Sequence, residues 1–250
     1  MKQLPDKIAV VTGGAGGFGE GIVKAYVEQG ARVVIADLDL ARGEALVREL
    51  GESTLFVRCD VSLRADIDAV IGACVQRFGV PDIVVNNAGT THNNTPMLEV
   101  DERIFDLVYA VNVKSIFHMA HAVVPLMRKR KSGVILNIGS TAGIRPRPGL
   151  TWYNGSKGAV NLLSKSMAVE LGPDGIRVNA ICPVIGETGL LQKFMGMPDT
   201  PENRKTFLAT IPLGRFSRPS DVAAAALFLA SDAAEFISGV EFPVDGARTV

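Results

Sequence analysis

The sequence has little cysteine, little histidine and no excess of either charge. Its 250 residues include three cysteines, three histidines and one tryptophan. Lys plus Arg and Asp plus Glu number 26 each, so the formal net charge is zero. A neutral chain produces no net field that would gather nucleic acid or an anionic membrane. We therefore expect no nucleic-acid partner and no membrane surface, and any charged binding surface must be local.

The cysteines do not fit a disulfide framework or a metal centre. Cys59, Cys74 and Cys182 are odd in number and show no CxxC spacing, which is typical of reduced thiols in a cytoplasmic protein. His118 and His121 lie three residues apart, but no further ligands can be placed beside them. The sequence therefore predicts neither disulfides nor a metal site.

Long hydrophobic runs are also lacking. The longest, residues 222–230, is too short to cross a bilayer. The first residues lead into a strand pattern without an apolar targeting segment. We expect a soluble, cytoplasmic protein. A length of 250 residues suffices for one large α/β domain, so we expect residues 1–250 to form a single domain.

The strongest local signal is a glycine-rich turn at residues 12–19, TGGAGGFG. It follows an apolar β-branched run and opens onto a helical pattern. Glycine lets the backbone approach a ligand closely, and a helix N-terminus attracts an anion. The turn therefore predicts a site for the pyrophosphate of a dinucleotide, formed by Gly13, Gly16, Gly17, Phe18 and Gly19.

Strand and helix patterns alternate along the whole chain. The expected strands are residues 8–11, 32–36, 54–58, 82–85, 134–138, 176–181 and 240–244, and the expected helices are residues 20–29, 40–50, 63–78, 101–129, 152–171 and 220–230. This alternation predicts an α/β fold of Rossmann type: a doubly wound parallel sheet with helices on both faces and the ligand at the carboxyl ends of the strands.

The residues at the strand ends indicate which dinucleotide binds. Asp37 ends the second strand, where a carboxylate accepts hydrogen bonds from the ribose hydroxyls and repels a 2′-phosphate. No Arg or Lys occurs in the glycine turn or directly after Asp37, so NAD is preferred over NADP. Asp60 with Val61, and the segment Asn86, Asn87, Ala88 and Gly89, follow two further strands and suit the adenine half, although each alone fits an ordinary turn.

A phenol and an amine lie four residues apart in the helix after the fifth strand. Tyr153 and Lys157 share a helix face, and an ammonium group near a phenol lowers its pKa. Ser140 leaves the preceding strand beside the presumed cofactor. Asn112 interrupts the apolar stripe of a helix. Its amide either forms hydrogen bonds with nearby backbone or has a catalytic role, and the spacing alone favours neither. The apolar segment around residues 184–213 is expected to form a substrate lid.

These residues resemble the short-chain dehydrogenase/reductase family over essentially the whole chain. The glycine turn matches the family's TGxxxGxG, residues 86–89 read NNAG, and YNGSK at residues 153–157 matches YxxxK. Asn112 and Ser140 have the expected order and spacing. Residues 177–188 resemble the family's RVN…PGxxxT element, except that Val184 stands where glycine is usual. A branched Cβ there is expected to narrow the pocket or shift the nicotinamide.

The resemblance implies a seven-stranded sheet and a role for each catalytic residue. Tyr153 resembles the family's acid/base, and Lys157 resembles the residue that lowers the pKa of this tyrosine and binds the nicotinamide ribose. Ser140 resembles the residue that orients the substrate oxygen, and Asn112 resembles the residue that holds a water in a proton relay. It also implies a homotetramer. The cofactor contacts carried over from the family include Leu38, Pro183, Ile185 and Thr188.

The leading functional prediction is an NAD-dependent secondary alcohol dehydrogenase or ketone reductase. Alternatives are a 3-oxoacyl thioester reductase acting on an acyl carrier protein or CoA substrate, whose acidic carrier would meet the basic run at residues 128–131, and a polyol or sugar dehydrogenase. A dinucleotide-binding regulator without turnover is the alternative from another class. The loops at residues 90–97, 141–150 and 184–197 are expected to select the substrate. Within them His92, Asn93 and Asn94 are either substrate contacts or a solvated loop.

Overall fold

A computed structural model describes residues 2–250. Within this range seven parallel strands form one sheet in the order β3-β2-β1-β4-β5-β6-β7. The strands are β1 Ile8–Thr12, β2 Arg32–Asp37, β3 Thr54–Arg58, β4 Ile83–Asn86, β5 Gly133–Ile138, β6 Ile176–Pro183 and β7 Glu241–Val244. The strand order reverses between β1 and β4, which creates the crevice where such sheets bind ligands. The predicted doubly wound α/β fold is confirmed.

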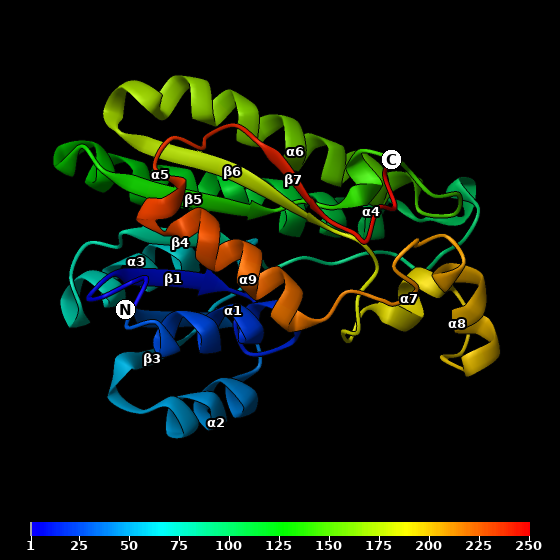
Figure 1. Cartoon of the computed structure of the whole chain (residues 1–250), viewed down its shortest axis with the longest axis horizontal. Coiled ribbons are helices and arrows are strands. Elements are labelled where there is room, and N and C mark those ends of the chain that lie inside the picture. Colours follow the sequence, from blue (N-terminus) through cyan, green and yellow to red (C-terminus); the bar gives the residue numbers. More distant parts are fainter. Residues whose placement is uncertain (1) are drawn as a thin grey trace.

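Helices cover both faces of the sheet (Figure 1). They are α1 Gly17–Glu28, α2 Leu40–Leu50, α3 Arg64–Arg77, α4 Glu102–Tyr109, α5 Ser115–Arg130, α6 Thr151–Leu171, α7 Leu191–Met195, α8 Pro201–Leu208 and α9 Pro219–Ala230. The sequence predicted α2 and β3 with the bounds that the structure gives them, and the other expected elements differ by a few residues at their ends.

Side-chain alternation along the strands builds two apolar layers. Val10 and Val34 point to the face covered by α3, α5 and α6. Val11 and Ile35 point to the opposite face, against α1 and α9. Successive residues of a strand face opposite sides, so strands buried on both sides must be apolar throughout. The buried strands thereby fix the position of the loops at their carboxyl ends.

The long helix expected at residues 101–129 is interrupted. A π turn, Ala110–Lys114, separates α4 from α5 and contains the buried Asn112. The continuous segment Glu102–Arg130 is long and apolar enough to cross a membrane by length and composition, and 44% of its most apolar window is buried. Core helices meet the same criterion, and Met119, Val123 and Met127 of α5 pack against the sheet.

The predicted lid region forms a small apolar layer of its own. The helices α7 and α8 stand beyond the carboxyl ends of the strands (Figure 1). Val184, Leu191, Met195, Ile211 and Phe216 are buried together there, apart from the two layers on the sheet. This layer closes one side of the crevice.

Candidate active site

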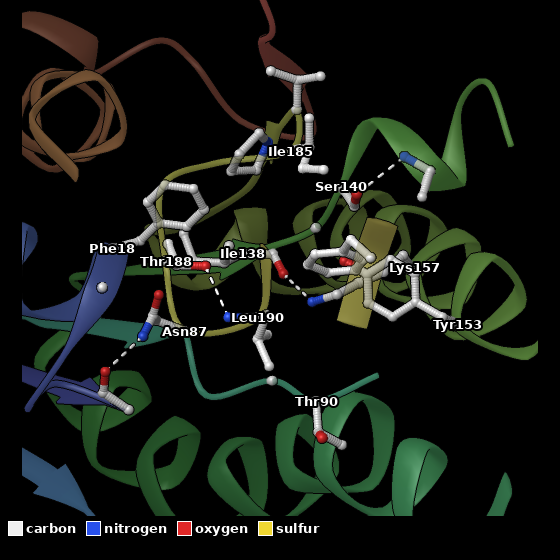
Figure 2. A pocket seen from close by; sticks show the side chains of 18 of the residues that line it. Phe18, Asn87, Thr90, Ile138, Ser140, Tyr153, Lys157, Ile185, Thr188 and Leu190 are labelled. Carbon is white, nitrogen blue, oxygen red and sulfur yellow. Dashed lines mark hydrogen bonds between the residues drawn. The ribbon is translucent and has the colours of Figure 1, made fainter. Parts of the chain in front are cut away.

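A pocket of about 280 Å³ lies at the carboxyl ends of the central strands (Figure 2). Most of the residues predicted for cofactor and catalysis line it: Gly13, Gly16, Gly17, Phe18, Asn87, Ala88, Gly89, Ser140, Tyr153, Lys157, Pro183, Ile185 and Thr188. Segments far apart in the sequence therefore meet at one cavity. Its lining runs from the glycine turn to the catalytic helix α6.

The glycine turn is shaped so that backbone can approach closely. Gly13 has φ +61°, and a Cβ built there would lie 2.9 Å from the Ala88 Cα. A Cβ on Gly19 would lie 2.0 Å from the Gly13 carbonyl oxygen, so Gly19 allows α1 to pack on the turn without itself lining the pocket. No side chain caps the N-terminus of α1 at Gly16. The free N–H groups there suit a pyrophosphate.

Thr12 and Asn87 tie the turn to the end of β4. The Thr12 hydroxyl accepts hydrogen bonds from the backbone N–H of Asn87 and of Ala88, at 3.0 and 3.1 Å. The Asn87 amide donates to the carbonyls of Thr12 and Gly13, at 2.8 and 2.9 Å. The NNAG segment therefore stabilises the glycine turn through Asn87 and Ala88. The part that Thr12 plays in this contact was not predicted from the sequence.

The carboxylate of Asp37 is held in place beside the glycine turn. The N–H groups of Ala15 and Asp39 donate to its two oxygens, at 2.9 and 3.0 Å. Each oxygen keeps a second lone pair for a ribose hydroxyl. Arg42, one turn into α2, lines the pocket at Gly16 and lies 3.5 Å from the Asp39 carboxylate. The sequence pattern did not indicate this arginine, because Arg42 lies five residues beyond Asp37 and not directly after it.

Asp37 and five other predicted positions do not line the described cavity. Leu38 is exposed and flanks Asp37, while Asp60 accepts hydrogen bonds from Ser62 and Val61 is buried in the layer with α3. Gly19 and Asn112 support residues that do line it. The cofactor contacts expected of Leu38, Asp60 and Val61 stay a prediction.

Ser140 and Tyr153 face the pocket together. The Ser140 hydroxyl oxygen accepts a hydrogen bond from the Ala142 N–H at 3.0 Å, so its own hydrogen is left to donate. Tyr153 is 7% exposed and its ring meets Phe194 edge-on, with the ring centroids 5.1 Å apart. The serine is thus oriented by the turn after β5 and the phenol by α6.

The sequence-based prediction of a lowered phenol pKa is wrong for this structure. Burial raises the pKa of Tyr153 to about 12, and the neighbouring Ser140 hydroxyl opposes that rise only in part. The Lys157 ammonium lies 5.9 Å from the centre of the Tyr153 ring and donates instead to the Ile138 carbonyl at 2.7 Å (Figure 2). Loss of hydration outweighs the attraction of the amine because both groups are buried.

Burial also lowers the pKa of Lys157 to about 8. Below pH 8 the amine is charged in the folded and the unfolded protein, and folding carries the whole cost of burying the charge. That cost disappears as the pH rises from about 8 toward the ordinary lysine value near 10.5. The folded protein therefore gains stability over this pH window through Lys157.

We predict that Lys157→Met gains stability relative to the wild type at pH 7 and loses most of that advantage at pH 10. The difference between the two pH values should be up to about 3 kcal/mol. Urea unfolding of both proteins at both pH values measures it. Lys157 does not contribute to the raised pKa values of the buried Cys59 and Cys74 thiols, so these thiols titrate alike in the two proteins and their contribution cancels. A free-energy difference that does not change with pH would show that Lys157 is not a buried charge.

Asn112 and His92 support the site through hydrogen bonds. The Asn112 amide donates to the Thr90 carbonyl and to the Ser156 hydroxyl, and its carbonyl accepts from the Thr90 N–H at 2.8 Å. These bonds hold the loop after β4 against the π turn and α6. The predicted relay water at Asn112 stays a prediction. His92 is 3% exposed, and its Nε2 accepts from the Tyr153 N–H at 3.4 Å, so it is not part of a solvated loop.

Val184 serves the lid as well as the pocket. Its side chain lines the cavity and is 4% exposed within the apolar layer of the lid. The Phe18 ring packs on Gly186, where a Cβ would lie 2.4 Å from the ring. The branched residue in place of glycine thus gives the lid an apolar anchor, while Phe18 connects the lid to the glycine turn.

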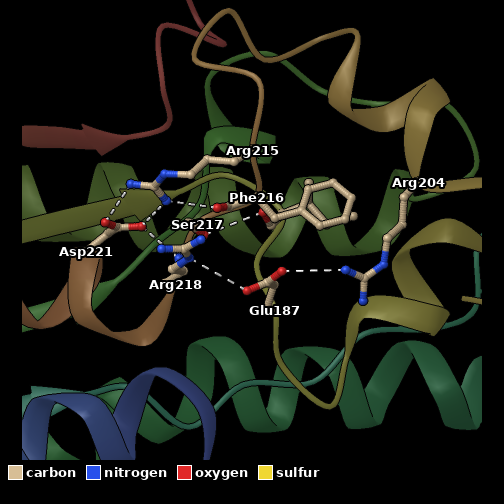
Figure 3. A network of polar contacts seen from close by, with 8 residues as sticks. Glu187, Arg204, Arg215, Phe216, Ser217, Arg218 and Asp221 are labelled. Carbon is tan, nitrogen blue, oxygen red and sulfur yellow. Dashed lines mark hydrogen bonds and ion pairs between the residues drawn. The ribbon is translucent and has the colours of Figure 1, made fainter. Parts of the chain in front are cut away.

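Charged side chains fasten the outer side of the lid (Figure 3). Arg204 of α8 pairs with Asp199 and lies 3.5 Å from the Glu187 carboxylate. Arg218, which precedes α9, approaches Glu187 from the other side at 4.0 Å, and Arg215 pairs with Asp221. Exposed pairs of this kind contribute little each, but together they hold residues 185–190 between α8 and α9.

Half of the residues that line the pocket were not among the predicted site residues. Arg147, Phe194 and Phe207 are three of them. Arg147 and Phe194 fall within loops that were expected to select the substrate, whereas Phe207 lies in α8 beyond them. Only the folded loops show which of their side chains reach the cavity.

Comparison with known proteins agrees with this geometry. A family model described as enoyl-(acyl carrier protein) reductase matches residues 13–248. The chain is 49% identical to 4-formylbenzenesulfonate dehydrogenase of Comamonas testosteroni, over 99% of this chain and 100% of that protein. It is 36% identical to a 3-oxoacyl-[acyl-carrier-protein] reductase of Thermotoga maritima, over 99% and 100% of the two chains.

A solved structure extends the likeness to the fold. The 3-ketoacyl-(acyl-carrier-protein) reductase of Brucella melitensis, solved as a complex with NADH, superposes with a TM-score of 0.94 at 42% identity, covering 99% of this chain and 100% of that one. From the motifs, the pocket and these relatives together, the chain is a nicotinamide-dependent oxidoreductase that belongs to the short-chain dehydrogenase/reductase family.

Proposed function

We propose that the protein transfers a hydride between NAD(H) and a secondary alcohol or the corresponding carbonyl compound. The observation that carries this proposal is the convergence of Ser140, Tyr153 and Lys157 on a pocket that begins at the glycine turn. The nicotinamide supplies the hydride chemistry when it is bound. The uncapped N-terminus of α1 and the close approach at Gly13 fit the pyrophosphate, and Asp37 fits the adenosine ribose.

The side chains perform the proton chemistry. The Ser140 hydroxyl donates a hydrogen bond that orients the substrate oxygen. Tyr153 gives its proton to that oxygen during reduction and takes it back during oxidation. Its raised pKa keeps the phenol protonated at neutral pH, which suits the acid role. Lys157, which donates to the Ile138 carbonyl, adds positive charge that opposes the effect of burial when the phenol ionises.

A panel of alcohols, ketones and aldehydes with NADH, NAD, NADPH and NADP tests the proposal. Aldehydes belong in the panel because a relative is named for a formyl substrate. We expect turnover with NADH and a preference for it over NADPH. Tight NADH binding without turnover of any compound would indicate a binding regulator instead.

A 3-oxoacyl thioester reductase is the second candidate, favoured by the relatives of that name. The basic run after α5 gives it little support. Arg128 and Lys131 both pair with Asp174, at 2.6 and 2.9 Å, and Arg130 lies 3.1 Å from Asp82. Asp174 and Asp82 offset part of the charge of these three cations, so an acidic carrier protein would meet a smaller positive charge there than the sequence of the run suggests.

We further propose a cytoplasmic homotetramer. Large apolar side chains on α4, α5 and α6 are exposed: Leu107 by 52%, Phe117 by 57%, Leu162 by 63% and Val169 by 81%. Contact between symmetry-related copies of these helices would bury them. We expect light scattering to give about four times the mass of one chain, and the mass of a single chain would contradict the tetramer.

A further inference from the structure

Arg147 lies between helix α6, which carries Tyr153, and the lid. The Arg147 carbonyl accepts a hydrogen bond from Asn154, the residue after Tyr153, at 2.8 Å. Its guanidinium lies over the Phe207 ring, 5.6 Å from the centre, and donates to the Thr210 hydroxyl at 3.0 Å. The side chain lines the pocket that Tyr153 also lines. A cation therefore lies in the wall of this cavity, between α6 and the lid.

No carboxylate among residues 2–250 forms a salt bridge with Arg147 or with its two arginine neighbours. Arg145 donates to the Arg248 carbonyl at 3.0 Å. Arg248 is 8% exposed, and within the described chain its Nε has no hydrogen-bond partner. Asp245, the carboxylate that acts on Arg248, accepts hydrogen bonds from Ala247 and Thr249 of its own turn.

This surplus of positive charge is destabilising without an anion. Burial and the charges of Arg248 and Arg145 lower the pKa of Arg147 to about 10. Buried cations in proteins are normally paired. An anion bound beside the Arg147 guanidinium would offset both the cost of burying its charge and the repulsion from Arg145 and Arg248. The fixed fork of a guanidinium matches two oxygens of a carboxylate or a sulfonate.

The cavity wall that α6 and the lid provide is largely apolar apart from Arg147 and the phenol of Tyr153. Leu150 and Leu190 line this part of the cavity, and Phe194 contacts the Tyr153 ring edge-on. A flat apolar body fills such a space with favourable ring contacts. The same cavity therefore offers a proton donor, apolar walls and a cation.

We propose that the substrates of this enzyme are aromatic carbonyl compounds or alcohols that carry a carboxylate or sulfonate, and that Arg147 binds this anionic group. The proposal rests on the proposed function, because Tyr153 acts on the oxygen at the opposite end of the same substrate. Arg147 determines specificity and takes no part in the proton transfer.

Matched ketone pairs test the charge preference in the presence of NADH. The pairs are 4-acetylbenzenesulfonate with 4-acetylbenzenesulfonamide, and 4-acetylbenzoate with its methyl ester. We expect the wild type to favour the anion by at least about tenfold in kcat/KM, and Arg147→Gln to lose this preference while the neutral compounds change by less than about threefold. Comparison of the two pairs shows whether the sulfonate or the carboxylate is preferred.

Arg145→Gln is the matched control, since it removes the same charge from the same loop outside the pocket lining. It should keep the preference, and Arg147→Lys should keep part of it. An equal loss for anion and neutral partner in Arg147→Gln would mean that Arg147 only fastens the lid, and would overturn the proposal. A wild type without charge preference would overturn it as well.

Calorimetry on the NAD-saturated protein separates anion binding from catalysis. Benzenesulfonate should bind at least about tenfold more tightly than benzenesulfonamide to the wild type and to Arg145→Gln, but not to Arg147→Gln. Binding with this pattern, without reduction of any ketone, would support the anion site and contradict the proposed function. Turnover of neutral ketones without this preference for the anion would support the proposed function and contradict the anion site at Arg147.

Discussion

Tyr153→Phe is expected to lose almost all NAD-linked turnover, with kcat lowered by about 10²–10⁴-fold. In the proposed mechanism the phenol hydroxyl, which lies next to Ser140 in the pocket, exchanges a proton with the substrate oxygen. Phenylalanine keeps the ring and its edge contact with Phe194 but carries no proton to give. Initial rates at saturating NADH and substrate measure the loss.

Two controls show whether the loss is chemical. NADH binding to Tyr153→Phe, followed by fluorescence, should stay within about threefold of the wild type because the ring still fills its place. Tyr109→Phe removes a phenol hydroxyl from α4, outside the pocket lining, and should leave turnover intact. If Tyr153→Phe kept more than a small residual fraction of turnover, Tyr153 would not be the acid/base.

Asp37→Ser is expected to turn the preference from NADH toward NADPH by about 100-fold in the ratio of kcat/KM values. The Asp37 carboxylate is fixed by the N–H groups of Ala15 and Asp39, where it repels a 2′-phosphate. Serine removes the charge and keeps a small hydrogen-bonding side chain. Arg42 lines the pocket one turn into α2 and can then pair with the phosphate.

The double variant Asp37→Ser/Arg42→Gln isolates the arginine's share. The double variant should use NADPH less well than Asp37→Ser does. Both variants lack the repulsion between Asp37 and the 2′-phosphate, but only Asp37→Ser keeps the Arg42 guanidinium that can pair with the phosphate. Initial rates with both cofactors at one fixed substrate concentration give all the ratios. An unchanged ratio in Asp37→Ser would place the adenosine ribose elsewhere, and would contradict the role given to this carboxylate.

Local sequence patterns determined the fold and about half of the pocket lining. Strands that are buried on both faces must be apolar throughout, so their limits can be predicted from composition. The expected bounds of the buried strands β1, β2, β4 and β5 differ from those in the structure by at most one residue at either end. The glycine turn, the NNAG segment and the pair Tyr153 and Lys157 each belong to one contiguous segment. Their order along the strands places them at the same edge of the sheet.

Tertiary structure decided what depends on several segments at once. The π turn at Asn112 forms where its side chain bonds Thr90 and Ser156, which no pattern in α4 or α5 reveals. The pKa of Tyr153 is set by burial rather than by the spacing of Lys157 alone. Arg147 reaches the cavity because its loop folds between α6 and the lid. Spacing fixes which side chains share an element, whereas hydration and charge balance depend on everything packed around them.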